Sequence, residues 1–353
     1  MLAMIHAVIM AGGKGTRFWP LSRSVKAKQY LNIVGNKSLL AQTIDNLQPF
    51  IAKENIWIVS NQAQLPYLEE YKNYIPGDQI LLEPVGKNTA PCIGWAAIEI
   101  QKKDPDATMI MLPADHFIEN IPEYQKTLQI AVDTAQTKNN LVTIGVQPKF
   151  AHTGYGYIEV TEKSDAVLQV KAFHEKPNKK IAESYIETGK FFWNSGLFIW
   201  RANKILGLIE AFLPHNFEVL QKIAKIDTSN DSNRNELTRL FNEFESISID
   251  YGIMEKSSNE TCLVPATFSW SDIGNWIALD DFWQKDEQGN ARKGQLIALD
   301  SKNNIVHSNK KLVTLVDVND LIVVESDDAL LILPKSSDQK IKDLYNELPE
   351  QYK

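Results

Sequence analysis

The sequence contains little cysteine and no long apolar run. Its two cysteines, Cys92 and Cys262, are far apart, and neither lies in the Cys/His spacing of a metal site. Two isolated cysteines favour a reducing compartment. The apolar start of the chain lacks the positive segment of a signal peptide, and no run approaches the roughly 20 residues of a transmembrane helix. These features predict a cytoplasmic protein.

The chain also lacks an excess of positive charge. Its formal net charge is −7 over 353 residues, and 44% of the residues are apolar and 23% charged. This composition is typical of a globular protein, and it provides no broad basic field that would neutralise nucleic-acid phosphates. We therefore expect neither nucleic acid nor membrane as a partner. Any phosphate ligand would be held by local cations and a metal ion.

Strands and helices are predicted to alternate along the first part of the chain. The expected strands cover 6–9, 55–60, 79–82, 107–112 and 141–146, and the expected helices cover 38–47, 62–74, 88–103 and 122–138. This alternation predicts an α/β fold with a Rossmann-like, mostly parallel sheet that has helices on both faces. Ligands of such sheets lie at the carboxyl ends of the strands.

The character of the sequence changes at the polar, turn-rich segment Asp286–Asn290. After it, short apolar β runs alternate with turns, and a helix is expected over 336–348. We predict two domains, 1–285 and 286–353, of which the second is a small β domain that ends in a helix.

The segment Met10–Arg23, MAGGKGTRFWPLSR, directly follows the first predicted strand. Glycines at 12, 13 and 15 let the backbone approach a ligand, and successive N–H groups then suit an oxyanion. Lys14 and Arg17 add positive charge. The segment matches neither the P-loop nor the dinucleotide-binding pattern, and a Gly-rich turn alone fits a simple tight turn as well.

Together with Lys28-Gln29-Tyr30-Leu31, this segment resembles the signature of sugar-nucleotide pyrophosphorylases. The WPLSR extension is most similar to mannose-1-phosphate guanylyltransferases. In that family a proline usually precedes the lysine, whereas this chain has Ala27. The resemblance implies a GT-A-like nucleotidyltransferase domain with a small β domain that is left-handed β-helix-like.

The resemblance also implies the reaction, which is transfer of GMP from GTP to α-D-mannose 1-phosphate to give GDP-mannose and pyrophosphate. The nucleophile is already an anion, so the reaction needs charge neutralisation and in-line alignment rather than a strong base. The family pattern assigns catalytic roles to Arg17 and Lys28. It assigns nucleotide contacts to Gly12, Gly13, Gly15 and Thr16.

Two aspartates are candidate ligands of Mg²⁺ or another divalent cation. Asp115 follows a buried strand in Leu112-Pro113-Ala114-Asp115-His116, and Asp272 lies in Trp270-Ser271-Asp272-Ile273-Gly274. Without the family motifs, Asp115 could as well be a turn or helix-cap residue as a metal ligand. Asp272 could likewise be a helix N-cap residue. The family motifs LPADH and WSDIG imply that both bind the metal and that Asp115 is also catalytic. His116 is interpreted as a structural neighbour.

Further family segments imply the substrate contacts. The stretch from Glu83 to Pro91 resembles a nucleotide-binding segment, although capping of the following helix explains one of its polar residues. Its expected nucleotide contacts are Glu83, Asn88, Thr89 and Ala90. The expected sugar-phosphate contacts are Gly154, Tyr155, Glu175, Lys176 and Asn194. The segment Ile249–Lys256 also resembles the family, but its apolar spacing fits a core helix and it is not assigned to the site.

Alternatives remain open at this point. The chain is also compatible with a nucleotidyltransferase for another sugar phosphate and nucleotide, with a silent GDP-mannose-binding regulatory protein, or with a sugar-binding protein without enzymatic activity. Exposed edges of the terminal β domain predict a homodimer. Because the chain ends near residue 353, without room for an added isomerase domain, no phosphomannose isomerase activity is expected.

Overall fold

The computed structural model describes residues 4–13, 15–162, 166–228 and 230–353. Lys14, part of the predicted phosphate-binding loop, lies outside these ranges. The chain folds into two compact units. The first unit comprises Met1–Gly12, Ile44–Pro113 and Ile118–Trp270, and the second comprises Gly13–Thr43, Ala114–Phe117 and Ser271–Lys353.

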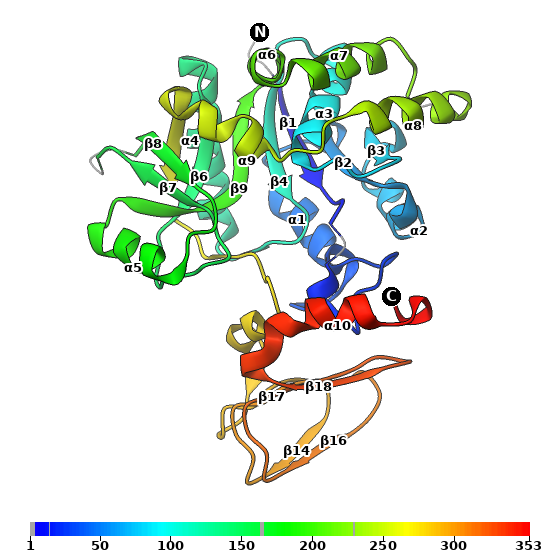
Figure 1. Ribbon diagram of the computed structural model, residues 1–353, viewed down its shortest axis with the longest axis vertical. Helices are drawn as coiled ribbons and strands as arrows, with labels where there is room; N and C mark the ends of the chain where they lie inside the picture. The colour runs from blue at the N-terminus through cyan, green and yellow to red at the C-terminus, as the bar shows by residue number, and fades with distance from the viewer. Residues whose placement is uncertain (1–3, 14, 163–165, 229) are drawn as a thin grey trace. The chain divides into compact units, whose positions relative to one another are not determined.

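The first unit is built on a sheet of 9 strands in the order β3-β2-β1-β4-β9-β6-β10-β8-β7 (Figure 1). Four strands at one side, β3-β2-β1-β4, are all parallel, and the remainder of the sheet is mixed. The strands are β1 Ile5–Met10, β2 Ile56–Asn61, β3 Ile80–Glu83, β4 Thr108–Pro113, β6 Leu141–Val146, β7 Tyr157–Val160, β8 Leu168–His174, β9 Phe191–Arg201 and β10 Thr261–Pro265. Since parallel strands end at one edge, β1, β3 and β4 deliver their following loops to the same side.

Helices cover this sheet and close its core. Their bounds are α1 Leu39–Leu47, α2 Leu65–Leu68, α3 Thr89–Lys103, α4 Ile121–Lys138, α5 Lys179–Thr188, α6 Ala202–Phe212, α7 Pro214–Ile223, α8 Arg234–Glu243 and α9 Ile249–Gly252. Helix α3 is buried along most of its length, and an added Cβ at Gly94 would lie 2.5 Å from Leu220 Cδ1 of α7. Close packing of α3 against α7 therefore depends on that glycine.

Most of the helices expected in the first part of the chain are present, but the expectation of one helix over 62–74 is wrong. That stretch forms a single α turn, α2, between 3-10 turns at Gln62–Gln64 and Glu69–Asn73. Pro66 lies in the first turn of α2 and lacks the backbone N–H that a helix begun at Gln62 would need at that position. Among the residues that the structure describes, no helix is both long and apolar enough to cross a bilayer.

The second unit contains the C-terminal β strands and helix α10 Ile341–Glu347. Its strands are β12 Gln284–Lys285, β13 Ala291–Lys293, β14 Leu296–Leu299, β15 Ile305–His307, β16 Val313–Val316, β17 Leu321–Glu325 and β18 Leu330–Pro334. Two further short strands, β5 Phe117–Ile118 and β11 Trp270–Ser271, pair with each other. Strands β13, β15 and β17 pair in parallel, as do β14 and β16, so successive coils stack as in a β-helix.

Buried asparagines hold these coils in register. Asn304 Nδ2 donates to Asn290 Oδ1 at 2.9 Å and to the carbonyl oxygen of Val318 at 3.1 Å. Asn290 Nδ2 in turn donates to the carbonyl oxygen of Ser301 at 2.9 Å. Because both asparagines are fully buried, these bonds satisfy polar groups that burial would otherwise leave unpaired.

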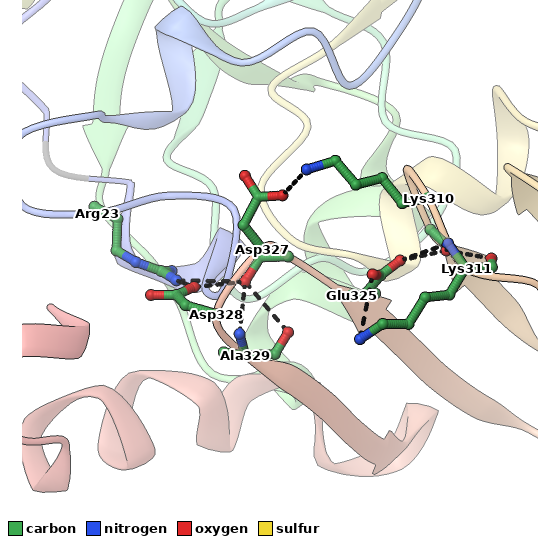
Figure 2. A network of polar contacts seen from close by, with 9 residues as sticks. Arg23, Lys310, Lys311, Glu325, Asp327, Asp328 and Ala329 are labelled. Carbon is green, nitrogen blue, oxygen red and sulfur yellow. Dashed lines mark hydrogen bonds and ion pairs between the residues drawn. The ribbon is translucent and has the colours of Figure 1, made fainter.

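The segment 13–43 belongs to the core of this second unit. Phe18 packs on Trp276 with ring centroids 5.0 Å apart, and Trp283 Nε1 donates to the carbonyl oxygen of Ile33 at 2.7 Å. Figure 2 shows a surface contact of the same segment, in which Arg23 pairs with Asp328 at 2.6 Å. The segment that follows the Gly-rich loop is therefore held mainly by aromatic packing, because a partly exposed ion pair of this kind contributes little.

Candidate functional site

Lys28 is the centre of a buried cluster in the second unit. Its Nζ lies 2.9 Å from Asp115 Oδ2 and donates to the carbonyl oxygens of Asp272 at 2.6 Å and Ile273 at 2.9 Å. Lys28 itself is 5% exposed. One ammonium group thus brings together two segments that are far apart in sequence, the loop after β4 and the loop after β11.

The backbone before Lys28 has a shape that proline would also adopt. Ala27 has φ −73° and ψ 168°, immediately before the 3-10 turn Lys28–Tyr30, and it is fully buried. Proline fixes φ near this value. The replacement of the usual family proline by Ala27 therefore leaves the local path of the chain compatible with the family pattern.

Two glycines allow the other charged groups to approach. Gly15 has φ +61°, and an added Cβ there would lie 2.6 Å from Lys28 Cβ. A Cβ at Gly274 would lie 2.8 Å from Asp272 Oδ2 and 3.4 Å from Arg17 Nη1. The structure therefore gathers Arg17, Lys28, Asp115 and Asp272 in one place, with the turn Thr16–Phe18 carrying the arginine.

The charges of this cluster favour an ionised carboxylate. Burial by itself would raise the pKa of Asp115, but Lys28, His116 and Arg17 outweigh it and lower that pKa below its ordinary value. Burial lowers the pKa of His116, against the opposing effect of Asp115 and Asp272, so the imidazole is neutral at pH 7. Two carboxylates beside a neutral ring fit Mg²⁺, which takes a few carboxylates and completes its shell with phosphate oxygens and water. No group of three or more His, Cys, Asp or Glu side chains with metal-site geometry occurs in the described ranges.

The predicted nucleotide segment lies in the first unit and is tied to its neighbours through backbone atoms. Asn88 caps α3 by accepting from Thr89 N at 2.9 Å, with φ +69°. Thr89 Oγ1 accepts from Ile249 N at 2.8 Å, and Ala90 N donates to the carbonyl oxygen of Ile247 at 3.1 Å. Asn88 therefore caps α3, and Thr89 and Ala90 attach the loop to the segment 247–249. These bonds fix the shape of the loop.

Glu83 ends β3 beside the end of β1. It is 6% exposed, its Oε1 has no hydrogen-bond partner among the described residues, and a Cβ at Gly12 would lie 3.4 Å from its Oε2. Burial raises the pKa of Glu83 to about 8. A buried carboxyl group with one unpartnered oxygen at the end of a parallel strand is suited to contact a ligand.

A second cluster in the first unit joins the predicted sugar-phosphate residues. A Cβ at Gly156 would lie 2.6 Å from Glu175 Oε2 and 3.5 Å from Asn194 Cβ, so Gly156 leaves room for both side chains. Lys176, at φ +44°, pairs with Glu175 Oε1. Tyr155 stacks on His152 with centroids 3.8 Å apart, and Gly154 N donates to His152 Nδ1 at 3.1 Å.

Asp250 is the residue that the sequence interpretation missed. Its Oδ1 accepts from Asn194 Nδ2 at 2.9 Å. Burial, followed by the charge of Glu175, raises the pKa of Asp250 to about 6. The family-like segment Ile249–Lys256 contained the signal, because Asp250 is a carboxylate among the apolar residues of its first half. The predicted residues thus form groups within each unit. Gly13 belongs to the second unit, as does the Lys28 cluster, and its carbonyl oxygen accepts from Gln29 Nε2 at 3.3 Å.

Comparisons with known proteins show the family to which the chain belongs. Residues 6–289 match the family model described as nucleotidyl transferase, and residues 294–348 match the one described as MannoseP isomerase/GMP-like beta-helix domain. The chain therefore belongs to the nucleotidyl transferase family. It is 35% identical over 344 residues to a mannose-1-phosphate guanylyltransferase of Klebsiella pneumoniae. This alignment covers 96% of this chain and 73% of that relative. Within the family, the chain groups with the mannose-1-phosphate guanylyltransferases.

Solved structures extend the comparison. A Thermus thermophilus protein described as a mannose-1-phosphate geranyltransferase has a TM-score of 0.87 at 29% identity and covers 97% of this chain and 98% of its own. A Helicobacter pylori mannose-6-phosphate isomerase has a TM-score of 0.62 at 27% identity, with 76% of this chain and 99% of its own covered. The predicted family, the fold with its terminal β-helix and the class of enzyme are confirmed.

Proposed function

We propose that this chain transfers GMP from GTP to α-D-mannose 1-phosphate, producing GDP-mannose for biosynthesis and releasing pyrophosphate. The observation that carries the proposal is the Lys28 cluster, which brings Arg17, Asp115 and Asp272 together around one ammonium group. The names of the relatives support the choice of substrates.

The reaction moves no proton in its central step. A phosphate oxygen of mannose 1-phosphate forms a bond to the α-phosphorus of GTP, and the bond from that phosphorus to the bridging oxygen breaks as pyrophosphate leaves. Arg17 and Lys28 stabilise the charge that develops on the transferred group. Asp115 and Asp272 would hold a Mg²⁺ ion, which supplies further charge neutralisation when it is bound.

The remaining groups orient the substrates. Glycines 12, 13 and 15 with Thr16 and the segment from Glu83 to Ala90 bind the nucleotide. Lys176 pairs with the sugar phosphate, and Glu175 and Asn194 accept or donate to sugar hydroxyls next to Gly154 and Tyr155. Asp250 accepts a hydrogen bond from the amide nitrogen of Asn194, and this bond fixes the orientation of the Asn194 amide.

The test measures pyrophosphate release from GTP with mannose 1-phosphate and Mg²⁺. Asp115→Asn should abolish release, whereas Asp133→Asn, an exposed aspartate on α4, should not change it. Release with a different sugar phosphate and nucleotide would overturn the choice of substrates. Tight GDP-mannose binding without any release would favour a silent regulatory protein instead.

We also propose that two copies of the chain associate through the terminal β domain. Strands β14, β16 and β18 and the residue before β16 carry large apolar side chains that are 51% to 62% exposed, namely Ile297, Leu299, Leu312, Val316, Leu330 and Ile332. Part of this face forms a groove of about 500 Å³. Monomeric proteins rarely expose a contiguous apolar patch of this kind.

Light scattering coupled to size exclusion tests the association. The wild-type chain should be a dimer, and Leu330→Lys with Ile332→Lys should make it a monomer because both side chains point outward from β18. Ile181→Lys, at an exposed position on α5, should leave the dimer intact. A monomeric wild-type chain would contradict the proposal. The cytoplasmic location and the absence of isomerase activity stay predictions.

A further inference from the structure

A cavity of about 900 Å³ lies in the first unit, and none of its lining residues is a predicted substrate contact. Its walls come from β2, β3, the second half of α3, residues 225–228 and 230 after α7, and the first turns of α8. We call it the β3–α8 cavity. Its volume lies within the range of sites that hold small-molecule ligands.

The inner wall of the β3–α8 cavity is apolar and aromatic. Trp57 and Trp95 line it together with Leu81 and Leu237, and all four side chains are less than 9% exposed. Trp95 Nε1 donates to Glu99 Oε1 at 3.2 Å, and its ring packs edge-on against Phe241 with ring centroids 5.1 Å apart, so the aromatic wall is held firmly in place. Such a wall favours a flat or otherwise apolar body.

The outer wall carries more positive than negative charge. Four cationic residues line the cavity, and three carboxylates accompany them: Lys102, Lys103, Lys225 and Arg234, with Asp78, Glu99 and Asp227. Lys103 Nζ pairs with Asp78 at 2.7 Å and lies 4.8 Å from the centroid of the Trp57 ring. In a chain with a net charge of −7, this local excess of positive charge favours an anionic group at the mouth.

Two of the elements that line the cavity, β3 and α3, adjoin the nucleotide segment in the chain. Strand β3 ends at Glu83, and α3 begins at Thr89. At the far end of α8, the carbonyl oxygens of Asn242 and Phe244 each accept from Lys87 Nζ at 3.0 Å. A ligand that shifts β3, α3 or α8 would therefore move the loop between residues 83 and 90.

We propose that the β3–α8 cavity is a regulatory site for a small anion with an aromatic body, and that its occupancy changes the affinity of the chain for GTP. The regulatory part rests on the nucleotide role proposed for the segment from Glu83 to Ala90. By linkage, GTP changes the affinity of the cavity for its ligand by the same factor.

Binding is tested with 8-anilinonaphthalene-1-sulfonate, a fluorescent aromatic anion, as the probe. Lys225→Glu combined with Arg234→Glu changes two exposed residues at the mouth and should weaken probe binding about tenfold or more. Thr238→Phe should also weaken probe binding, because the larger side chain fills part of the cavity without changing its charge. The matched control, Lys126→Glu with Lys138→Glu, reverses two exposed charges on α4 and should leave binding unchanged. Equal titrations for all variants would overturn the site.

Regulation is tested by titrating GTP calorimetrically with and without saturating probe. In the wild-type chain the probe should shift the dissociation constant of GTP roughly fivefold, and in the Lys225→Glu/Arg234→Glu variant it should not. A probe that binds the cavity but leaves GTP affinity unchanged would overturn the regulatory role. Failure of GTP to bind in any sample would instead reject the proposed function, while the probe titrations still decide whether the cavity binds anions.

Discussion

Asn194 and Asp250 form one hydrogen-bonded pair, in which the amide Nδ2 donates to the carboxyl Oδ1 at 2.9 Å. The other end of the amide accepts from Gly196 N at 3.0 Å. Both ends of the Asn194 side chain are thus held, which fixes the orientation of its amide. The arrangement requires a carboxyl group in a place where burial and Glu175 raise its pKa to about 6.

Asp250→Asn should make stability less dependent on pH. Because folding raises the pKa of Asp250, its favourable contribution is full below about pH 4 and is lost as the pH rises through about 6. At pH 8 the variant should therefore be more stable than the wild type, by up to about 3 kcal/mol, since asparagine is never ionised and can still accept from Asn194. Urea denaturation at pH 4 and pH 8 measures this difference. Asp133→Asn is the control, and an equal effect of Asp250→Asn at both pH values would contradict the expectation.

The contiguous motifs predicted residues that the structure brings together around Lys28. They did not predict the pairing of Asp250, which depends on a distant partner. Arg17, Lys28 and Asp115 follow buried or well-formed elements in family motifs, so their positions were predictable. Asp250 lies in an apolar run, and only the fold places Asn194 beside it. Likewise, Asn88 and Thr89 were predicted as ligand contacts, but the tertiary bond from Ile249 N to Thr89 could not be inferred from local pattern.

Lys28→Gln should lower kcat by about 100-fold, because it removes a cation from the place where charge develops on the transferred phosphate. The same change removes the largest influence that lowers the pKa of Asp115, so that pKa should rise. Because the ionised carboxylate is needed, the pH at which activity appears should rise as well. Pyrophosphate release measured between pH 5 and 9 follows both effects. Lys37→Gln, at an exposed position of the same unit, should behave as the wild type. An unchanged kcat for Lys28→Gln would exclude the catalytic role.

Gly274→Ala should weaken activation by Mg²⁺. The added Cβ would lie 2.8 Å from Asp272 Oδ2, which forces that carboxylate away from its present position. Changes that displace a metal ligand, or a group that orients one, lower metal affinity roughly 10-fold or more. Activity titrated with Mg²⁺ gives the half-saturating concentration. Gly77→Ala, where a Cβ would meet no atom within 4 Å, serves as the control, and a curve identical to the wild type for Gly274→Ala would argue against Asp272 as a ligand.

Ala27→Pro should stabilise the chain by about 0.5 to 1 kcal/mol without changing kcat. The native φ of −73° suits proline, which restricts the unfolded chain more than alanine does. Because the backbone at Ala27 already has angles that proline adopts, the position of Lys28, and with it kcat, should not change. Thermal unfolding and kcat together measure this. A lower melting temperature would show that the buried surroundings of Ala27 do not accommodate the ring.

Glu83→Gln should abolish the release of protons that accompanies GTP binding. Burial raises the pKa of Glu83 to about 8, so the free protein carries a protonated carboxyl group at pH 7. A carboxylate that accepts from guanine N–H groups must be ionised, so binding would release close to one proton per nucleotide and would strengthen as the pH rises towards 8. Calorimetry in buffers of different ionisation enthalpy counts the protons. The difference between wild type and Glu83→Gln isolates this carboxyl from the titration of GTP itself, and equal proton release in both would place the guanine contact elsewhere.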